Sequence, residues 1–300
     1  QLQVLRTLGG WLAAEPYAGG AVVAGAALQA AATPLADALL ARLVAGEARP
    51  AFAHLEPAAR TLHQAPRCML RRQGGGWRLD GHKTAVAGAP GATHFVVSAV
   101  DEAGPVLVCV DAGAPGLSLQ AGRLLDGSEA ARLQFDAVPV ADGARLGDAS
   151  LLEQLLDTAT LATCAEALGV LQRLQADTVE HLRTRQQFGQ PLAAFQVLQH
   201  RLADLHIARV QAEALTWAVA EGFEAACADE RALAASSAAL AVDRACRAVG
   251  EGAVQLHGAM GVTEELTAAR FARRALHIGL QHGDRLHHLQ RCDRLLNPDP

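Results

Sequence analysis

The chain has 300 residues, of which 51% are hydrophobic and 19% charged, and its formal net charge is -5 at pH 7. This composition excludes a globally disordered chain, and the negative charge argues against general binding of nucleic acid. The length suffices for two or three packed domains, and the abundance of alanine over aromatic residues favours helices.

The sequence predicts no membrane span and no metal site. The apolar stretch 21–32 is too short and too rich in alanine and glycine to cross a bilayer, and no basic region leads into an apolar core at the start of the chain. The six cysteines form no Cys-x-x-Cys pair, so we expect buried, reduced thiols rather than metal ligands or disulfides. These features together predict a cytoplasmic protein.

The predicted elements divide the chain into three parts, at 1–48, 49–148 and 149–300. Residues 1–48 carry apolar residues at helical spacing, and Pro34 marks a predicted helix start. In residues 49–148, short strand-forming runs alternate with Gly, Pro and Asp, which predicts a small antiparallel barrel or sandwich. These runs are Gly76–Leu79, His94–Val100, Val106–Val110, Leu117–Gln120 and Leu133–Val140.

From about residue 150 the helical period returns and continues to the end of the chain. The apolar positions predict one helix over residues 161–174, a second over 198–215 and a third over 231–249. Long amphipathic helices with short connections are typical of an antiparallel four-helix bundle. The predicted fold is therefore mainly α, with a central β-domain.

The first informative motif is Arg185-Gln-Gln-Phe-Gly-Gln-Pro191. Its pattern predicts a helix that ends near Arg183, a turn, and a new helix that starts near Phe195. The guanidinium of Arg185 offers a planar fork of donors that suits a diphosphate. The more ordinary interpretation is that Arg185 bonds the last carbonyls of its own helix.

The second motif is Gln255-Leu-His-Gly-Ala-Met-Gly261, at a predicted junction between two helices. Its two glycines, Gly258 and Gly261, would let backbone amides approach a phosphate or a ring closely. The alternative is an ordinary helix C-cap followed by a turn.

Together the two motifs resemble the acyl-CoA dehydrogenase family, with its R-x-x-F-G-x-P and F-Q-x-x-Q-H-x-L-A-D segments and its later Q-L-x-G-G-x-G-x-T-x-E segment. The run Gly76-Trp-Arg-Leu-Asp-Gly-His-Lys83 is similar to the family's G-x-x-L-x-G-x-K hairpin. The resemblance covers nearly the whole chain and favours the small-subunit type of bacterial heteromeric dehydrogenases, such as those acting on pimeloyl or steroid side-chain thioesters. It implies a partial N-terminal helical domain, a middle β-barrel and a C-terminal four-helix bundle.

The resemblance also implies a function. A FAD-dependent acyl-CoA dehydrogenase would oxidise an acyl-CoA to the 2-enoyl-CoA, in fatty acid or steroid side-chain catabolism, and pass electrons to an electron-transfer flavoprotein. Such a chain would work in a homo- or hetero-oligomer. A second hypothesis is a non-catalytic small subunit that completes the FAD site of a heteromeric acyl-CoA dehydrogenase.

In the family, the arginine of the first motif binds the FAD diphosphate, and the second motif of a neighbouring subunit holds the adenosine half. The FAD-binding residues implied by this are Arg185, Phe188, Gln196, Gln255, Leu256, His257 and Gly258. The half of the site that surrounds the flavin ring departs from the family. Its T-E-P-x-x-G-S-D segment appears as Ala53-His-Leu-Glu56-Pro57 without the Gly-Ser-Asp, and its W-I-T-N-G segment appears as Ala85-Val-Ala-Gly-Ala89.

The family removes the α-proton of its substrate with a glutamate, and neither family position holds one here. The usual position holds His282, and the alternative position falls on Ala159, two residues after Asp157. The resemblance therefore implies His282 or Asp157 as the base, and an ordinary histidine pKa near ~6.5 allows proton acceptance at neutral pH. The alternative is that His282, His287 and His288 only hydrogen-bond or pack at a subunit interface.

Overall fold

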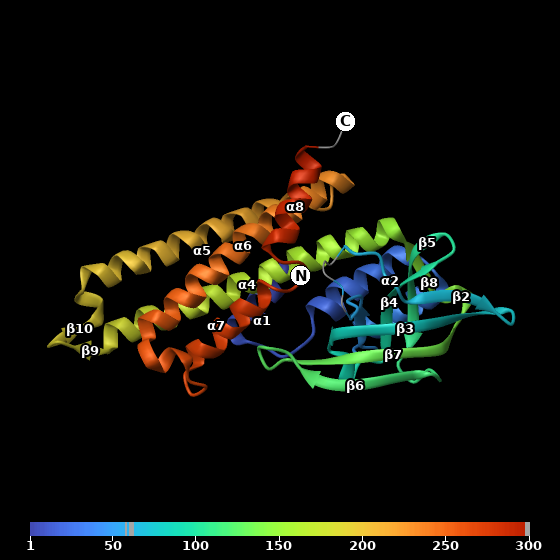
Figure 1. The fold of residues 1–300 in the computed structure, drawn as a ribbon, viewed down its shortest axis with the longest axis horizontal. Coiled ribbons are helices and arrows are strands. Elements are labelled where there is room, and N and C mark those ends of the chain that lie inside the picture. The colour runs from blue at the N-terminus through green and yellow to red at the C-terminus, as the bar shows by residue number, and fades with distance from the viewer. Residues whose placement is uncertain (58, 60–62, 298–300) are drawn as a thin grey trace. The chain divides into compact units, whose positions relative to one another are not determined.

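The computed structural model describes residues 1–57, 59 and 63–297 (Figure 1). The positions where the sequence lacks the family's Gly-Ser-Asp fall partly on 58 and 60–62, outside these described residues. The chain forms two compact units, Ala14–Ala159 on the one hand and Gln1–Ala13 with Thr160–Pro300 on the other. None of the described helices is both long and apolar enough to cross a membrane.

The unit Ala14–Ala159 begins with helices. A π-helical segment (Ala18–Ala24) leads directly into α2 (Gly25–Ala31), and α3 (Pro34–Val44) follows. The Oγ1 of Thr33 caps α3 by accepting a hydrogen bond from the amide of Ala36 at 3.2 Å. Pro34 occupies the first turn of α3, where a missing amide proton costs nothing, so the predicted helix start is confirmed.

A mixed sheet fills the rest of this unit (Figure 1). Its strands are β1 (Pro50–Ala53), β2 (Met69–Gln73), β3 (Gly76–Ala87), β4 (His94–Asp101), β5 (Gly104–Asp111), β6 (Leu117–Arg123), β7 (Glu129–Val140) and β8 (Arg145–Asp148). The strand order is β6-β7-β3-β2-β4-β5-β8, with β1 beside β4. The five predicted runs all lie within strands. The pairing is not wholly antiparallel, because β1 and β2 both run parallel to β4, which long connections between these strands permit.

The core of this unit lies around β4, whose residues Phe95, Val96 and Val97 are all fully buried. Consecutive buried residues indicate that both faces of the strand are covered. Val23 and Leu28 from the preceding helical segments belong to the same apolar cluster, so helices cover part of the sheet.

The other unit is helical. It contains α1 (Leu2–Trp11), most of α4 (Ala149–Thr184), α5 (Gln196–Gly222), α6 (Ala228–His257), α7 (Thr267–Ile278) and α8 (Arg285–Leu296). The three predicted helices fall within α4, α5 and α6, which run alongside one another in Figure 1 and share one apolar core. The C-terminal helical domain is therefore confirmed.

Glycines allow α1 to approach α4 closely. A Cβ added at Gly169 would overlap the carbonyl oxygen of Arg6, and one added at Gly9 would overlap the carbonyl oxygen of Glu166. Backbones this close leave no room for a side chain between them. The approach is fixed further by a hydrogen bond of 2.9 Å from Arg6 Nη2 to Gln172 Oε1.

The cysteines only partly fit the expectation of buried thiols. Cys109 and Cys164 are buried, and burial raises the pKa of each thiol to about 12, which makes both unreactive. Cys68 and Cys246 are also buried. The expectation was wrong for Cys227, which is exposed because it stands at the N-cap of α6.

Candidate cofactor and active site

The motif around Arg185 folds as a tight hairpin between α4 and α5. Two short strands, β9 (Gln186–Gln187) and β10 (Gln190–Pro191), pair antiparallel across a turn formed by Phe188 and Gly189. Both turn residues have a positive φ, 55° and 80°, as a two-residue hairpin turn requires. The helix before the hairpin ends, and the one after it begins, within one residue of the predicted positions.

The side chains of this hairpin are open to solvent. Phe188 is 89% exposed, with its ring edge-on to Phe195 at a centroid distance of 6.1 Å. Arg185 is exposed, and its guanidinium hydrogen-bonds to none of the residues that the structure describes. Instead, the amide of Arg185 closes the helix by donating to the carbonyl of His181 at 2.9 Å. The interpretation of Arg185 as a cap for its own helix is therefore wrong, and its guanidinium is accessible to an anion.

The second motif forms the end of α6. Gly258 follows the helix with a φ of 64° and acts as its C-cap, which confirms the alternative interpretation of this glycine. Gln255 and Gly258 are exposed, whereas Leu256 and His257 are buried and anchor the segment. Gln196, the remaining residue of the predicted FAD set, is exposed at the start of α5.

A pair of stacked histidines joins the two motifs within one chain. The rings of His181 and His257 lie face to face, with centroids 4.3 Å apart and an interplanar angle of 29°. The Nδ1 of His257 is fixed by a bond of 2.8 Å with the carbonyl oxygen of Ala253. The ends of α4 and α6 therefore meet, and the residues after them lie at the same end of the bundle. His181 stands one helical turn before Arg185, but it belongs to neither of the two motifs in the sequence.

The candidate base His282 lies in the turn between α7 and α8. Its φ is 55° and that of Gly283 is 110°, so both residues are in the positive-φ region. The turn packs directly on the ring of His287, because a Cβ at Gly283 would overlap that ring. Asp284 ends the turn as the N-cap of α8, where Oδ1 accepts from the amide of His287 at 2.8 Å.

A small cavity adjoins this turn. Its wall includes Thr160, Thr163, Asp243, Gln281, His282 and His288. Two buried atoms in that wall, Gln281 Oε1 and His288 Nδ1, hydrogen-bond to none of the described residues. A cavity with unpaired polar atoms suits water or a polar part of a ligand.

The two histidines after His282 are buried by the chain itself. The rings of His287 and His288 meet edge to face at 5.0 Å, and the residues are 5% and 3% exposed. Burial, followed by the charges of His287 and Arg291, lowers the pKa of His288 to about 4. His287 and His288 are thus neutral packing residues at physiological pH, buried within the chain and not at the subunit interface that the alternative interpretation expected, whereas His282 is only half-buried.

The second candidate base, Asp157, belongs to the other compact unit. Asp157 lies in α4 and is 1% exposed, and Ala159, two residues later in the chain, is also buried. A fully buried carboxylate needs hydrogen-bond partners or a counter-charge to stay ionised. This burial makes Asp157 a less accessible base than His282.

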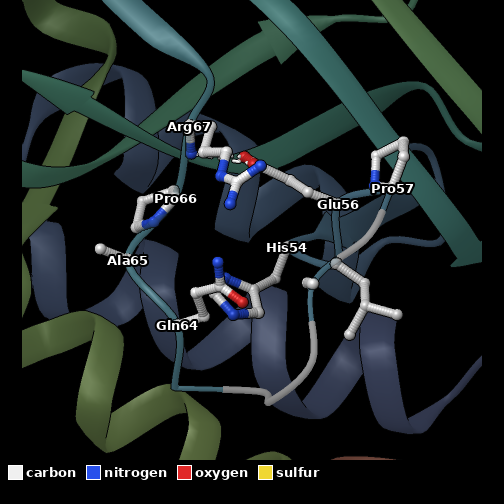
Figure 2. Close-up of a pocket in the computed structure, with 9 residues that line it drawn as sticks. His54, Glu56, Pro57, Gln64, Ala65, Pro66 and Arg67 are labelled. Atoms are coloured by element: carbon white, nitrogen blue, oxygen red, sulfur yellow. Dashed lines mark hydrogen bonds between the residues drawn. The ribbon is translucent and has the colours of Figure 1, made fainter.

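In the part expected to surround the flavin ring, Glu56 is held by its own loop. Its carboxylate accepts hydrogen bonds from the amides of Arg67 at 2.9 Å and Cys68 at 3.0 Å. Figure 2 shows this carboxylate facing Arg67 across the loop. Lys83, on β3, donates to the Oε1 of Glu56 at 2.7 Å.

The environment of Glu56 keeps it ionised. Burial alone would raise the pKa of Glu56, but the hydrogen bond and charge of Lys83, together with the amides of Cys68 and Arg67, hold that pKa below its ordinary value. With these partners the carboxylate is structural rather than a free base. Lys83 ends the hairpin motif in the sequence, but that motif does not predict its pairing with Glu56. The only local signal was a charged residue within a strand pattern.

Half of the expected FAD site is open to the cofactor. Arg185 and Gln255 are both exposed, and the buried Leu256 anchors the segment around Gln255, which fits the binding of a dinucleotide. In the part expected to surround the flavin ring, Ala85 is exposed with a φ of 51° and offers no aromatic ring to stack on a flavin.

Comparisons with known proteins identify the domains of the chain. Residues 51–138 match the acyl-CoA dehydrogenase middle domain, and residues 149–285 match the acyl-CoA dehydrogenase C-terminal domain. The chain is 30% identical to acyl-CoA dehydrogenase FadE27 of Mycobacterium tuberculosis, over 100% of this chain and 81% of that protein. Other curated relatives, also 30% identical, are matched over only 57% to 64% of their own length.

Two solved structures are similar over almost the whole chain. One is a variant of the Tcur3481-Tcur3483 steroid ACAD, with a TM-score of 0.90 and 33% identity, covering 98% of this chain and 80% of that chain. The other is the ChsE4-ChsE5 complex from Mycobacterium tuberculosis, with a TM-score of 0.90 and 28% identity, covering 99% and 80%.

Proposed function

Because the chain belongs to the acyl-CoA dehydrogenase family, we propose that it works as a FAD-dependent acyl-CoA dehydrogenase subunit. It would convert an acyl-CoA to the 2-enoyl-CoA, with electrons leaving to an electron-transfer flavoprotein. Bound FAD would supply the acceptor for the β-hydrogen and its electron pair. We place the chain in an oligomer with further copies or with a homologous companion.

One observation carries this proposal. The stacking of His181 on His257, at 4.3 Å, holds together the ends of α4 and α6, which carry the two cofactor motifs. In an oligomer, neighbouring subunits would each contribute one of these motifs to a FAD site. The guanidinium of Arg185 there is exposed and has no hydrogen-bond partner among the described residues. An exposed guanidinium without a protein partner suits a diphosphate, to which arginine can donate two parallel hydrogen bonds.

The chain's own contribution to the chemistry would be a base. The neutral imidazole of His282 would accept the α-proton of the thioester while the β-hydrogen leaves as hydride. His282 is half-buried, in a turn held by the buried ring of His287. A rigid turn of this kind keeps the imidazole in one place, which general-base catalysis requires.

The second candidate function is a non-catalytic subunit that completes the FAD site of a companion chain. The observation that favours it is the lack of a glutamate at both family positions, His282 and Ala159. Glu56 cannot substitute, because Lys83 and two backbone amides occupy its carboxylate. Two of the similar solved structures, the Tcur3481-Tcur3483 steroid ACAD variant and the ChsE4-ChsE5 complex, are named for pairs of proteins, so we expect a companion chain.

The test is the visible spectrum of the purified full-length protein before and after anaerobic addition of a mixed set of acyl-CoAs. A flavin band that bleaches supports the dehydrogenase. Flavin that never bleaches, or the absence of bound flavin from the protein purified alone, supports the companion-subunit function. The substitution Arg185→Gln should weaken FAD binding by roughly tenfold or more, because a charge-assisted hydrogen bond contributes about 1.5–3 kcal/mol. Arg183→Gln, also exposed in the last turn of α4, should leave binding unchanged.

A further inference from the structure

This inference rests on the proposed FAD site. We propose that His181 is a further ligand-binding residue of that site, and that its imidazole takes up a proton when the FAD diphosphate binds beside Arg185.

The position of His181 relative to Arg185 is fixed by the backbone. The carbonyl of His181 accepts the amide of Arg185 at 2.9 Å, so the two residues are joined across the last turn of α4. His181 is half-buried, whereas its stacking partner His257 is buried, so His181 is the more exposed residue of the pair. An anion held by Arg185 would lie in the immediate electrostatic environment of the His181 ring.

The stacked partner disfavours two positive charges within the pair. The bond of His257 to the carbonyl of Ala253 needs a proton on Nδ1, so the neutral ring carries its lone pair on Nε2. Two imidazolium rings stacked at 4.3 Å would repel each other strongly. The more exposed ring, His181, is the one that a ligand and solvent protons can reach.

The charges that act on His181 come from both helices that meet there. Burial lowers the pKa of His181, and His257 on α6 and Arg185 after α4 lower it further. These neighbours are neutral or cationic, so His181 is a neutral ring without ligand at neutral pH. A diphosphate between Arg185 and His181 would reverse this local field.

The sign of the pH dependence follows from this reversal. The pKa of His181 is below its ordinary value in the free protein and would rise in the complex, so binding would take up a proton. FAD affinity should therefore be greatest in mild acid. The affinity should fall by up to about tenfold per pH unit as the pH rises from the pKa of His181 in the free protein to the pKa of His181 in the complex.

The experiment is a calorimetric titration of the flavin-free full-length protein with FAD near pH 7, in buffers of different ionisation enthalpy. The dependence of the heat on the buffer gives the number of protons bound. We expect an uptake of up to about one proton in the unmodified protein. His181→Phe keeps a ring over His257, His181→Gln keeps polarity, and each should abolish the uptake. His206→Gln, which removes an exposed histidine of α5, should leave it unchanged.

The outcomes separate this inference from the proposed function. FAD binding without proton uptake, or uptake that persists in both His181 variants, overturns the inference and leaves the FAD site in place. Failure to bind FAD at all overturns both. CoA also carries a diphosphate, so it is titrated separately. Uptake with CoA but not with FAD would overturn the assignment of the pair to the flavin nucleotide.

Discussion

Lys83 is the only lysine in the chain, it is fully buried, and its Nζ lies 2.7 Å from the Oε1 of Glu56. Its ammonium also donates to the hydroxyl of Ser98 at 2.9 Å and to the carbonyl of His54 at 3.0 Å. Three acceptors around one ammonium satisfy all of its donors. The pair therefore joins the loop after β1 to the middle of β3 without leaving an unpaired charge.

Removal of this cation should destabilise the protein strongly. In Lys83→Met, Glu56 stays buried beside its backbone amides but loses its counter-charge, so we expect a loss of about 3–5 kcal/mol in the free energy of unfolding. Urea denaturation measures this loss. The double variant Lys83→Met/Glu56→Gln should recover part of it, and Arg123→Met, on an exposed position of β6, should have little effect. A Lys83→Met protein as stable as the unmodified one would contradict the structural role of the pair.

The approach of α1 to α4 depends on Gly169. In Gly169→Ala the new methyl group would overlap the carbonyl oxygen of Arg6, so the two helices must separate, at a cost of about 1–3 kcal/mol. Gly222→Ala is the matched control, because nothing lies within 4 Å of a Cβ at that position. Thermal unfolding should show a lower midpoint for Gly169→Ala and an unchanged or higher midpoint for Gly222→Ala. Equal midpoints would show that α1 does not pack tightly.

The buried His288 should make stability depend on pH. Its pKa is lowered to about 4 in the folded protein against about 6.5 in an unfolded chain, so protons bind preferentially to the unfolded state. Its contribution is complete above pH 6.5 and is lost as the pH falls towards 4, by about 2 kcal/mol between pH 7 and pH 5.

Denaturation at both pH values, with and without His288→Gln, checks this dependence. In this variant, most of the difference in unfolding free energy between pH 7 and pH 5 should disappear. A smaller part should remain, because burial also lowers the pKa of His287. His206→Gln should retain the whole difference, because it removes an exposed histidine. A His288→Gln protein with the full difference would place the titrating group elsewhere.

The proposed base is tested at His282. Asparagine tolerates the positive φ of 55° at this position, so His282→Asn removes the imidazole without straining the turn. If His282 accepts the α-proton, the rate of flavin bleaching by acyl-CoA should fall by about 10²–10⁴-fold, while the FAD content stays the same. Stopped-flow absorbance measures both. A large loss in Asp157→Asn instead would identify Asp157 as the base.

Local pattern was enough to predict most of the secondary structure. The end of α4 and the start of α5 lie within one residue of the predicted positions, because the Gly and Pro of the motif at Arg185 force a turn there. The start of α3 at Pro34 was equally predictable from the sequence. The sequence predicted the β-domain but not its parallel pairs, because strand direction depends on the course of connections that have no periodic signal.

The cofactor residues were predictable only as motifs. The sequence located Arg185 and Gln255, and their spacing carried the resemblance to the family. It could not show that the ends of α4 and α6 meet, and so it missed His181. It also could not distinguish the buried His287 and His288 from the half-buried His282, since all three have the same chemistry in the printed sequence.

The sequence by itself therefore determined the coarse order of helical and strand segments and the family, because propensity, periodicity and turn residues act over a few neighbouring positions. The tertiary structure alone decided which polar residues are partners. Lys83 meets Glu56, and His181 stacks on His257, only after strands and helices far apart in the chain have packed. Burial then sets their charge, because the free energy of an ionised group depends on what surrounds it and not on its place in the sequence.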